Sequence, residues 1–159
     1  MTPTIRSATV EDAEQLARLR WEFRIESGTP ASRARAAFDE EMRGFLADVF
    51  AAASPWRVWV AEAHRGLVGC VWLQLVELVP HPNRGRWERP IAYVTNMYVA
   101  PELRDRGIGR ELLDRAIAYA KEREVDGIVL WPSPRSAPFY ERAGFGSEGA
   151  GVWLDVAGD

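Results

Sequence analysis

Residues 98–113 read YVAPELRDRGIGRELL, and this stretch decides how the chain folds. A strand of apolar residues ends at Val99, Pro101 stops it, and a helix with one apolar face follows. Gly107 and Gly109 stand where the helix begins, so the backbone there can come close to a ligand. The first N–H groups of a helix lack partners within it and, together with the helix dipole, attract anions. The stretch therefore predicts an anion site between a strand and a helix.

Three arginines add charge to this anion site: Arg104, Arg106 and Arg110. A charge-assisted hydrogen bond from such a side chain contributes about 1.5–3 kcal/mol when it is partly desolvated. A pyrophosphate fits the arrangement. The alternative, that the glycines only shape a turn and the arginines form a solvated face, stays open at this point. Two other phosphate motifs fail, because a dinucleotide fingerprint needs Gly or Ala where Leu112 stands and the sequence lacks the Gly-Lys-Ser/Thr of a P-loop.

Outward from this stretch, the spacing of apolar residues predicts strands and helices in a mixed order. The expected strands cover residues 4–8, 56–62, 67–76, 91–99, 127–131 and 152–156. The expected helices cover residues 9–25, 38–53, 108–120 and 136–142. Both faces of strand 67–76 are apolar, so this strand is expected inside the sheet. Tight turns favour antiparallel pairing, whereas the helical crossover from residue 99 to 127 favours a parallel pair. The sequence therefore predicts a mixed α/β sheet.

Length and composition exclude several classes of protein. The chain has 159 residues, which is the length of one domain. Its 20 Lys and Arg against 23 Asp and Glu give a net charge of −3, without the basic excess of nucleic-acid-binding domains. No apolar segment reaches the about 18 residues of a membrane span, and the first residues lack the apolar core of a secretory signal. One cysteine and two histidines leave no disulfide and no caged metal to expect. We therefore expect a cytoplasmic protein of one domain, with no metal and no nucleic-acid or membrane partner.

A second motif lies farther along the chain, where residues 138–145 read PFYERAGF. Together with the pattern V-x-P-x-x-R-x-x-G-I-G at residues 99–109, this motif resembles the GNAT superfamily of acetyl-CoA-dependent N-acetyltransferases. The first pattern is similar to the family's pyrophosphate-binding Arg/Gln-x-x-Gly-x-Gly/Ala, and the second to its Tyr-Glu-x-x-Gly-Phe. The resemblance implies a mostly antiparallel central sheet with about four flanking helices. It also implies that strands 91–99 and 127–131 are parallel and splay apart into a notch.

The resemblance further implies how acetyl-CoA lies in this notch. Backbone groups of Met97 and Val99 would pair with the pantetheine amides, and loop 104–110 would hold the pyrophosphate. Ser133 stands where the family often has an asparagine that contacts the pantetheine arm. The residues expected to contact the co-substrate are Met97, Tyr98, Val99, Arg104, Asp105, Arg106, Gly107, Ile108, Gly109, Arg110, Ser133, Phe139 and Tyr140.

The reaction expected from the resemblance is direct attack of a primary amine on the acetyl thioester in a ternary complex. Tyr140 is the family's usual proton donor to the departing thiolate, and it is expected to act as much by hydrogen bonding to that charge as by full proton transfer. Cys70 is flanked by apolar residues without a neighbouring base, so we expect a buried structural thiol and no acyl-enzyme.

A general base is harder to find in the sequence. The strand before Arg104 carries no carboxylate, so Tyr93, Thr95 and Asn96 could only orient a water molecule. Glu77, at the end of the preceding strand, is the nearest plausible catalytic carboxylate, and an exposed strand-end charge is the open alternative.

The acceptor site is expected between the first two helices and loop 80–90. Two carboxylates could receive a cationic amine, and three arginines of the loop could receive an anionic tail. The candidate acceptor-binding residues are Glu22, Glu26, Tyr93, Thr95 and Asn96, with Arg84, Arg86 and Arg89 in the loop. The acceptor is expected to be a small-molecule or peptide amine.

Two further alternatives stay open. The chain could be a non-catalytic acyl-CoA-binding module of the same fold, or an unrelated phosphate-binding or nucleotide-binding protein. Strand 152–156 could also pair with a second chain in a homodimer.

Overall fold

Five strands form one sheet in the order β1-β2-β3-β4-β5 within the part of the chain that the structure describes. The computed structural model describes residues 2–28, 31–80, 82 and 89–146. The strands are β1 (Thr4–Ser7), β2 (Trp56–Ala63), β3 (Gly66–Val76), β4 (Ile91–Val99) and β5 (Gly127–Val129). The first four pair antiparallel, whereas β4 and β5 are parallel. The predicted mixed α/β sheet is confirmed, and β3 lies inside it; the expected strand 152–156 falls outside the described residues.

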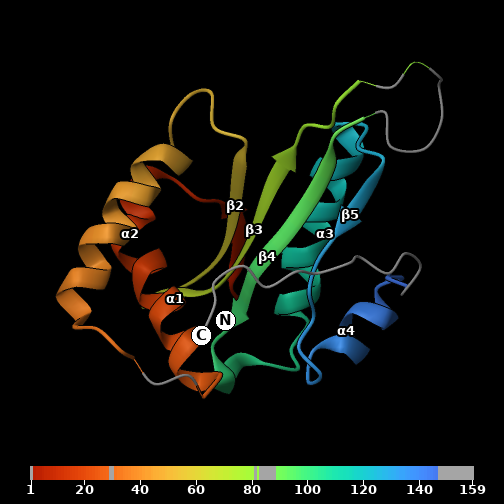
Figure 1. Ribbon diagram of the computed structural model, residues 1–159. Helices are drawn as coiled ribbons and strands as arrows, with labels where there is room; N and C mark the ends of the chain where they lie inside the picture. Colours follow the sequence, from red (N-terminus) through yellow and green to blue (C-terminus); the bar gives the residue numbers. More distant parts are fainter. Residues whose placement is uncertain (1, 29–30, 81, 83–88, 147–159) are drawn as a thin grey trace.

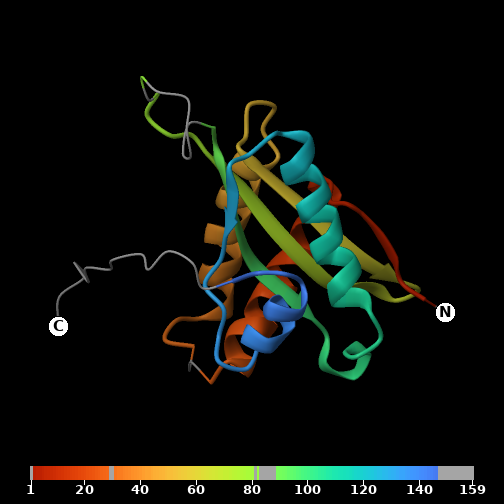
Figure 2. The ribbon, with the colours of Figure 1, turned by 90° about the vertical axis from the view of Figure 1, so that its right-hand side faces the viewer.

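Helices cover both faces of this sheet, as Figures 1 and 2 show. One face carries α1 (Ala13–Glu26) and α2 (Arg35–Val49). The other carries α3 (Ile108–Glu122) and α4 (Ala137–Arg142). Two short 3-10 turns, Val10–Asp12 and Pro101–Leu103, precede α1 and α3. No helix within the described ranges is long and apolar enough to cross a membrane.

Two expected elements end earlier in the structure than their apolar spacing predicts. The helix expected over 38–53 is α2, which ends at Val49, because the chain turns through 50–55 to enter β2. In that turn the Ser54 N–H donates to the Ala51 carbonyl over 3.0 Å. Phe45, expected on the buried face, is 39% exposed. The strand expected over 127–131 stops at Val129, where its pairing with β4 also stops.

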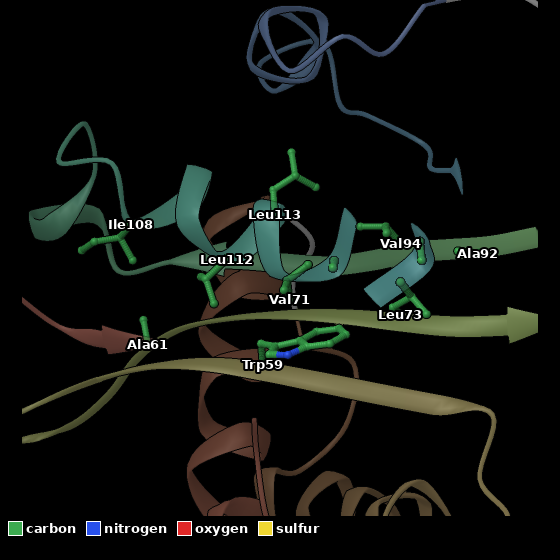
Figure 3. Packing of buried hydrophobic residues seen from close by; sticks show 11 residues of the cluster. Trp59, Ala61, Val71, Leu73, Ala92, Val94, Ile108, Leu112 and Leu113 are labelled. Carbon is green, nitrogen blue, oxygen red and sulfur yellow. The ribbon is translucent and has the colours of Figure 1, made fainter. Parts of the chain in front are cut away.

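The core lies on both faces of the central strand, because alternate side chains of β3 point to opposite sides. Val71 and Leu73 face α3 and contact buried residues such as Leu112, as Figure 3 shows. Cys70 and Trp72 instead join the buried side chains of α1 and α2. The position of β4 next to β3 is thereby fixed between two apolar layers.

The close approach of β3 to β4 predicts that Gly69→Ala destabilises the fold. A Cβ at Gly69 would lie 2.8 Å from the backbone oxygen of Tyr98, so β4 would have to move. We expect a loss of about 1–3 kcal/mol, which is roughly 2–4 °C in Tm per kcal/mol at this chain length, measured by thermal unfolding.

The matched control is Gly44→Ala. Gly44 lies exposed within α2, and a Cβ there would meet no atom within 4 Å. Alanine should therefore leave Tm unchanged or raise it, since alanine favours a helix over glycine by roughly 1 kcal/mol. Equal Tm values for the two variants would contradict the packing described for Gly69.

Candidate functional site

The strand β4 loses its β5 partner partway along its length. The parallel ladder contains three residue pairs, from Ile91 with Gly127 to Tyr93 with Val129. From Val94 to Val99, β4 has no strand beside it on this side within the described chain, and we call residues 94–99 the open edge of β4. The predicted splaying of the parallel pair is confirmed.

Backbone groups of the open edge alternate between the two sides of β4. The Ala100 N–H donates to the Val68 carbonyl over 2.8 Å, toward β3. In an antiparallel ladder the preceding residue, Val99, then directs its own N–H and C=O away from β3. The same alternation applies to Met97, since Tyr98 pairs with Cys70. The groups of Met97 and Val99 therefore face the side where β5 is missing.

A β-bulge interrupts β4 in the middle of this edge. The β3–β4 register shifts between Cys70 and Trp72, and Asn96 there has a φ of +47°. This left-handed backbone is strained for a residue other than glycine. Two contacts hold it: the Cys70 thiol donates to the Asn96 carbonyl at 3.5 Å, and the Arg20 guanidinium donates to Asn96 Oδ1 at 3.1 Å.

The first turn of α3 lies directly against the open edge. Gly107 caps the helix with a φ of +84°, which a residue with a side chain adopts only at a cost of about 1–2 kcal/mol. A Cβ at Gly109 would lie 3.5 Å from Met97 Cε and 3.8 Å from the Phe139 ring. The structure thus brings Met97, Gly109 and Phe139 together, beside the amides that open α3.

Arg104 does not extend freely into this region. Its Nε donates to the Val99 carbonyl at 2.8 Å, and its two terminal nitrogens donate to the Glu26 carboxylate at 2.6 Å each. Arg135, between β5 and α4, donates to the same carboxylate at 2.9 Å. The hydrogen bonds from Arg104 hold the pKa of Glu26 at about 2. Glu26 therefore joins the end of β4 to the chain segment that follows β5.

The remaining charged residues of the predicted pyrophosphate loop are exposed. Asp105, with a φ of +60°, and Arg106 point to the surface of the loop, and no ion pair of either is found in the described chain. Arg110 is paired with Asp114 one turn along α3, at 2.8 Å. Exposed pairs of this kind are weak, so Arg110 remains available to a ligand.

Tyr140 reaches the open edge from α4. Its hydroxyl donates to Met97 Sδ at 3.5 Å, and its ring lies between those of Phe139 and Phe145. Burial raises the pKa of the Tyr140 phenol above its ordinary value, so the group is a proton-bearing donor at neutral pH.

Ser133 has a local role at the start of α4. Its hydroxyl lies 3.0 Å from that of Ser136 and accepts the Ser136 N–H at 3.3 Å. Its carbonyl accepts the N–H groups of Ser136 and Ala137. The contact of Ser133 with a pantetheine arm stays a prediction.

The predicted acceptor residues of β4 lie on the face covered by α1. Thr95 pairs with Trp72, and Tyr93 with Gln74, and Trp72 belongs to the buried layer under α1 and α2. The Tyr93 hydroxyl donates to the Thr95 hydroxyl at 3.0 Å. Trp131, just beyond β5 and 68% exposed, meets the Tyr93 ring edge-on at 5.0 Å between centroids. These side chains form an aromatic and hydroxyl-bearing wall beside the bulge.

The predicted carboxylates stand apart from this wall. Glu77 is exposed beyond Val76, which pairs with Ile91 at the start of β4. Met97 lies six residues farther along β4 than Ile91, which is roughly 20 Å at about 3.3 Å per residue. Glu22 is already paired with Arg18 at 2.8 Å, and Glu26 with Arg104. The roles assigned to these three carboxylates stay predictions. Arg84 and Arg86 lie outside the described residues.

The sequence does not predict three residues of the site: Arg20, Trp131 and Arg135. Arg20 carries the clearest signal in retrospect, because a charged residue stands next to Leu19 on the apolar stripe of its helix. Trp131 and Arg135 follow a strand end and carry no local signal. Within the described residues, no group of three or more His, Cys, Asp or Glu side chains could hold a metal ion.

Comparison with known proteins agrees with this geometry. The family model described as the acetyltransferase (GNAT) domain matches residues 54–146. An uncharacterised N-acetyltransferase of Methanocaldococcus jannaschii is 33% identical over 79 residues, which are 48% of this chain and 30% of that protein. The matched segment thus spans less than a third of the length of this curated relative.

Solved structures resemble the whole fold, among them the following two. One is a predicted acetyltransferase of Clostridium acetobutylicum with acetyl-CoA, at 25% identity and a TM-score of 0.82, covering 96% of each chain. The other is a GCN5-related N-acetyltransferase of Ralstonia eutropha, at 30% identity and a TM-score of 0.80, covering 98% of this chain and 99% of that one.

The Glu26 ion pair predicts a pH-dependent contribution to stability. The pKa of Glu26 lies at about 2 in the folded chain against an ordinary value of 4.5, so its contribution is complete above pH 4.5 and is lost as the pH falls toward 2. We expect Glu26→Gln to lower stability by about 1–2 kcal/mol at pH 7, and by progressively less from pH 4.5 downward, in thermal unfolding.

Glu22→Gln is the control on the same helix. Its partner Arg18 lies one turn away and both side chains are well exposed, so we expect a loss below about 0.5 kcal/mol. A difference between wild type and Glu26→Gln that stays constant from pH 7 to pH 3 would disprove the assignment.

Proposed function

Because this chain belongs to the GNAT acetyltransferase family, we propose that it transfers the acetyl group of acetyl-CoA to a primary amine. The observation that carries the proposal is the open edge of β4, which meets the first turn of α3 and the Tyr140 hydroxyl at one residue, Met97. A thioester held there would have hydrogen-bonding backbone on one side and a phenol donor on the other.

The residues present fit acetyl-CoA as co-substrate. The backbone groups of Met97 and Val99 that face away from β3 suit the amides of the pantetheine arm, although the Val99 carbonyl is already occupied by Arg104. The amides that open α3 suit the pyrophosphate, because they lack partners within the helix. Arg106 and Arg110, at the surface of the same loop, would add charge-assisted donors.

Arg104 supports this site indirectly in our proposal. Its guanidinium fixes the end of β4 through the Val99 carbonyl and fixes α1 through Glu26. It therefore shapes the loop whose backbone would contact the pyrophosphate. The charge of its side chain is already compensated by Glu26.

The proposed reaction is direct attack of the amine nitrogen on the acetyl carbonyl carbon. A carbon–nitrogen bond forms, the carbon–sulfur bond breaks, the amine loses a proton, and the coenzyme A thiolate gains one. A lysine-like amine has a pKa of about 10.4, so about 4 in 10⁴ molecules are neutral at pH 7, and deprotonation costs about 4–5 kcal/mol. A base or a chain of water molecules is therefore useful.

The positions of Tyr93, Thr95 and Asn96 support a chain of water molecules as the proton path better than direct proton transfer to Glu77. The Tyr93 and Thr95 hydroxyls are hydrogen-bonded to each other on the face beside the bulge. Asn96 follows them along the strand. Glu77, the predicted base, lies beyond the start of β4 and would act only through such a relay.

A non-catalytic acyl-CoA-binding protein of the same fold is the second candidate, because β4 carries no carboxylate. One experiment separates the two: acetyl-CoA-dependent thiol release measured over polyamines, amino acids, aminoglycosides and peptides. Thiol release with any amine supports the transferase. Tight binding of coenzyme A without thiol release across the panel would support the binding protein.

Tyr140→Phe tests the proton donor. Removal of the hydroxyl should lower kcat by about 10- to 1000-fold, because the departing thiolate loses its hydrogen bond, while the Kd of acetyl-CoA changes little. The control is Tyr119→Phe, since Tyr119 lies near the C-terminal end of α3, where its ring contacts Trp59 of β2. An unchanged kcat in Tyr140→Phe would refute the assigned role.

Direct transfer also predicts that Cys70 stays unacetylated. Burial raises the pKa of the Cys70 thiol to about 12, so almost no thiolate exists at neutral pH, and the thiol already donates to Asn96. Mass spectrometry after incubation with acetyl-CoA alone should show no added acetyl group on Cys70. Detection of acetylated Cys70 would contradict direct attack and indicate a two-step mechanism through an acyl-enzyme.

A further inference from the structure

Arg20 lies beside the open edge of β4, and no carboxylate among the described residues pairs with its charge. It follows the buried Leu19 on α1, and its guanidinium carbon lies 5.9 Å from the centre of the partly buried Phe23 ring. One of its nitrogens donates to Asn96 Oδ1 at 3.1 Å. A guanidinium has five N–H donors, so most of those on Arg20 have no acceptor in the part of the chain that the structure describes.

Three nearby arginines differ from Arg20 in this respect, whereas Arg24, also without an ion pair among the described residues, is exposed. Arg18, Arg35 and Arg104 are each paired with a carboxylate at 2.6–2.8 Å. No ion pair of Arg20 occurs among the described residues. Its pKa is lowered because burial removes the guanidinium from water and because Arg24 lies nearby. A partly buried charge without a counter-charge is costly, so a site that keeps one usually has a use for it.

Arg20 also lies close to Met97, the residue at which the thioester is proposed to be held. Asn96, its hydrogen-bond partner, directly precedes Met97, which Tyr140 contacts from α4. Arg20 and Tyr140 therefore approach consecutive residues of β4 from opposite faces of the sheet. Tyr93 and Thr95 share the face of Arg20, so the guanidinium belongs to the wall that borders the bulge on the acceptor side.

We infer that Arg20 binds an anionic group of the acceptor, a carboxylate or a phosphate, so that the acceptor is a small amine carrying an acid near its amino group. This inference rests on the proposed transfer to an amine. A guanidinium binds either anion through two parallel hydrogen bonds, which fixes the orientation of the ligand as well as its position. Anchoring the acid beside Asn96 would place the amine next to Met97, where the thioester is expected.

The test uses pairs of acceptors that differ only in the acid. The pairs are the amino acids that carry a primary amine against their amides, and O-phosphoethanolamine against ethanolamine, in the thiol-release assay. The first pairs test a carboxylate and the last tests a phosphate. We expect the wild type to prefer the acid-bearing member of at least one pair by 10-fold or more in kcat/KM.

Three variants separate recognition of the acid from support of the bulge. Arg20→Gln should lower kcat/KM 10- to 100-fold for the acid-bearing acceptor and less than 3-fold for its neutral partner. Asn96→Ala removes the hydrogen bond to Arg20 but leaves the charge, so the preference for the acid should persist. Arg24→Gln is the control, since Arg24 is an exposed arginine one turn along the same helix.

Calorimetry tests the inference without turnover. The same acceptor pairs are titrated into the protein saturated with coenzyme A, and the acid-bearing member should bind at least 10-fold more tightly to the wild type than to Arg20→Gln. If no amine releases thiol but this difference is present, the proposed transfer fails and the role of Arg20 stands. If amines react without any preference for an acid, or Arg20→Gln slows both members of a pair equally, the role of Arg20 is overturned and the transfer stands.

Discussion

The end of the β4–β5 ladder after three residue pairs is the constraint on which the rest of the site depends. Beyond Tyr93, the backbone groups of β4 that face away from β3 have no strand beside them within the described residues, and buried backbone groups need partners. The first turn of α3, the loop before it and the phenol of Tyr140 all border this same edge. A ligand with amide groups along its length can take the place of the missing strand, as proposed above for acetyl-CoA.

The interior position of β3, the antiparallel pairing across tight turns and the parallel pair could be predicted from the sequence, because each follows from local patterns. The contact between Met97, Gly109 and Phe139 does not follow from such patterns, since these residues lie far apart in the chain. The apolar spacing of β3 predicts an interior strand, and the glycines after Val99 predict a turn that opens a helix. The early end of α2 could not be predicted, because Phe50 and Ala53 continue the helical spacing. The need to turn the chain into β2 outweighs that spacing.

The partners of the charged side chains could not be predicted either, since they come from distant parts of the chain. Arg104 and Glu26 are 78 positions apart, and Arg20 and Asn96 are 76 apart. A pattern within one segment shows that an arginine is present but not which group it meets. In the structure Arg104 is paired with a carboxylate of α1, whereas Arg20 of α1 has no carboxylate partner among the described residues.

The bulge at Asn96 has a consequence for how β4 can change during evolution. Thr95 and Tyr98 are three positions apart, yet their partners Trp72 and Cys70 are two apart and lie on the same face. The extra residue therefore restores the alternation of side chains, so that Met97 faces α3 and Tyr98 faces α1. Removing or adding one residue between Val94 and Val99 would exchange the two faces of the strand's second half. The length of this segment is therefore constrained separately from the identity of its residues.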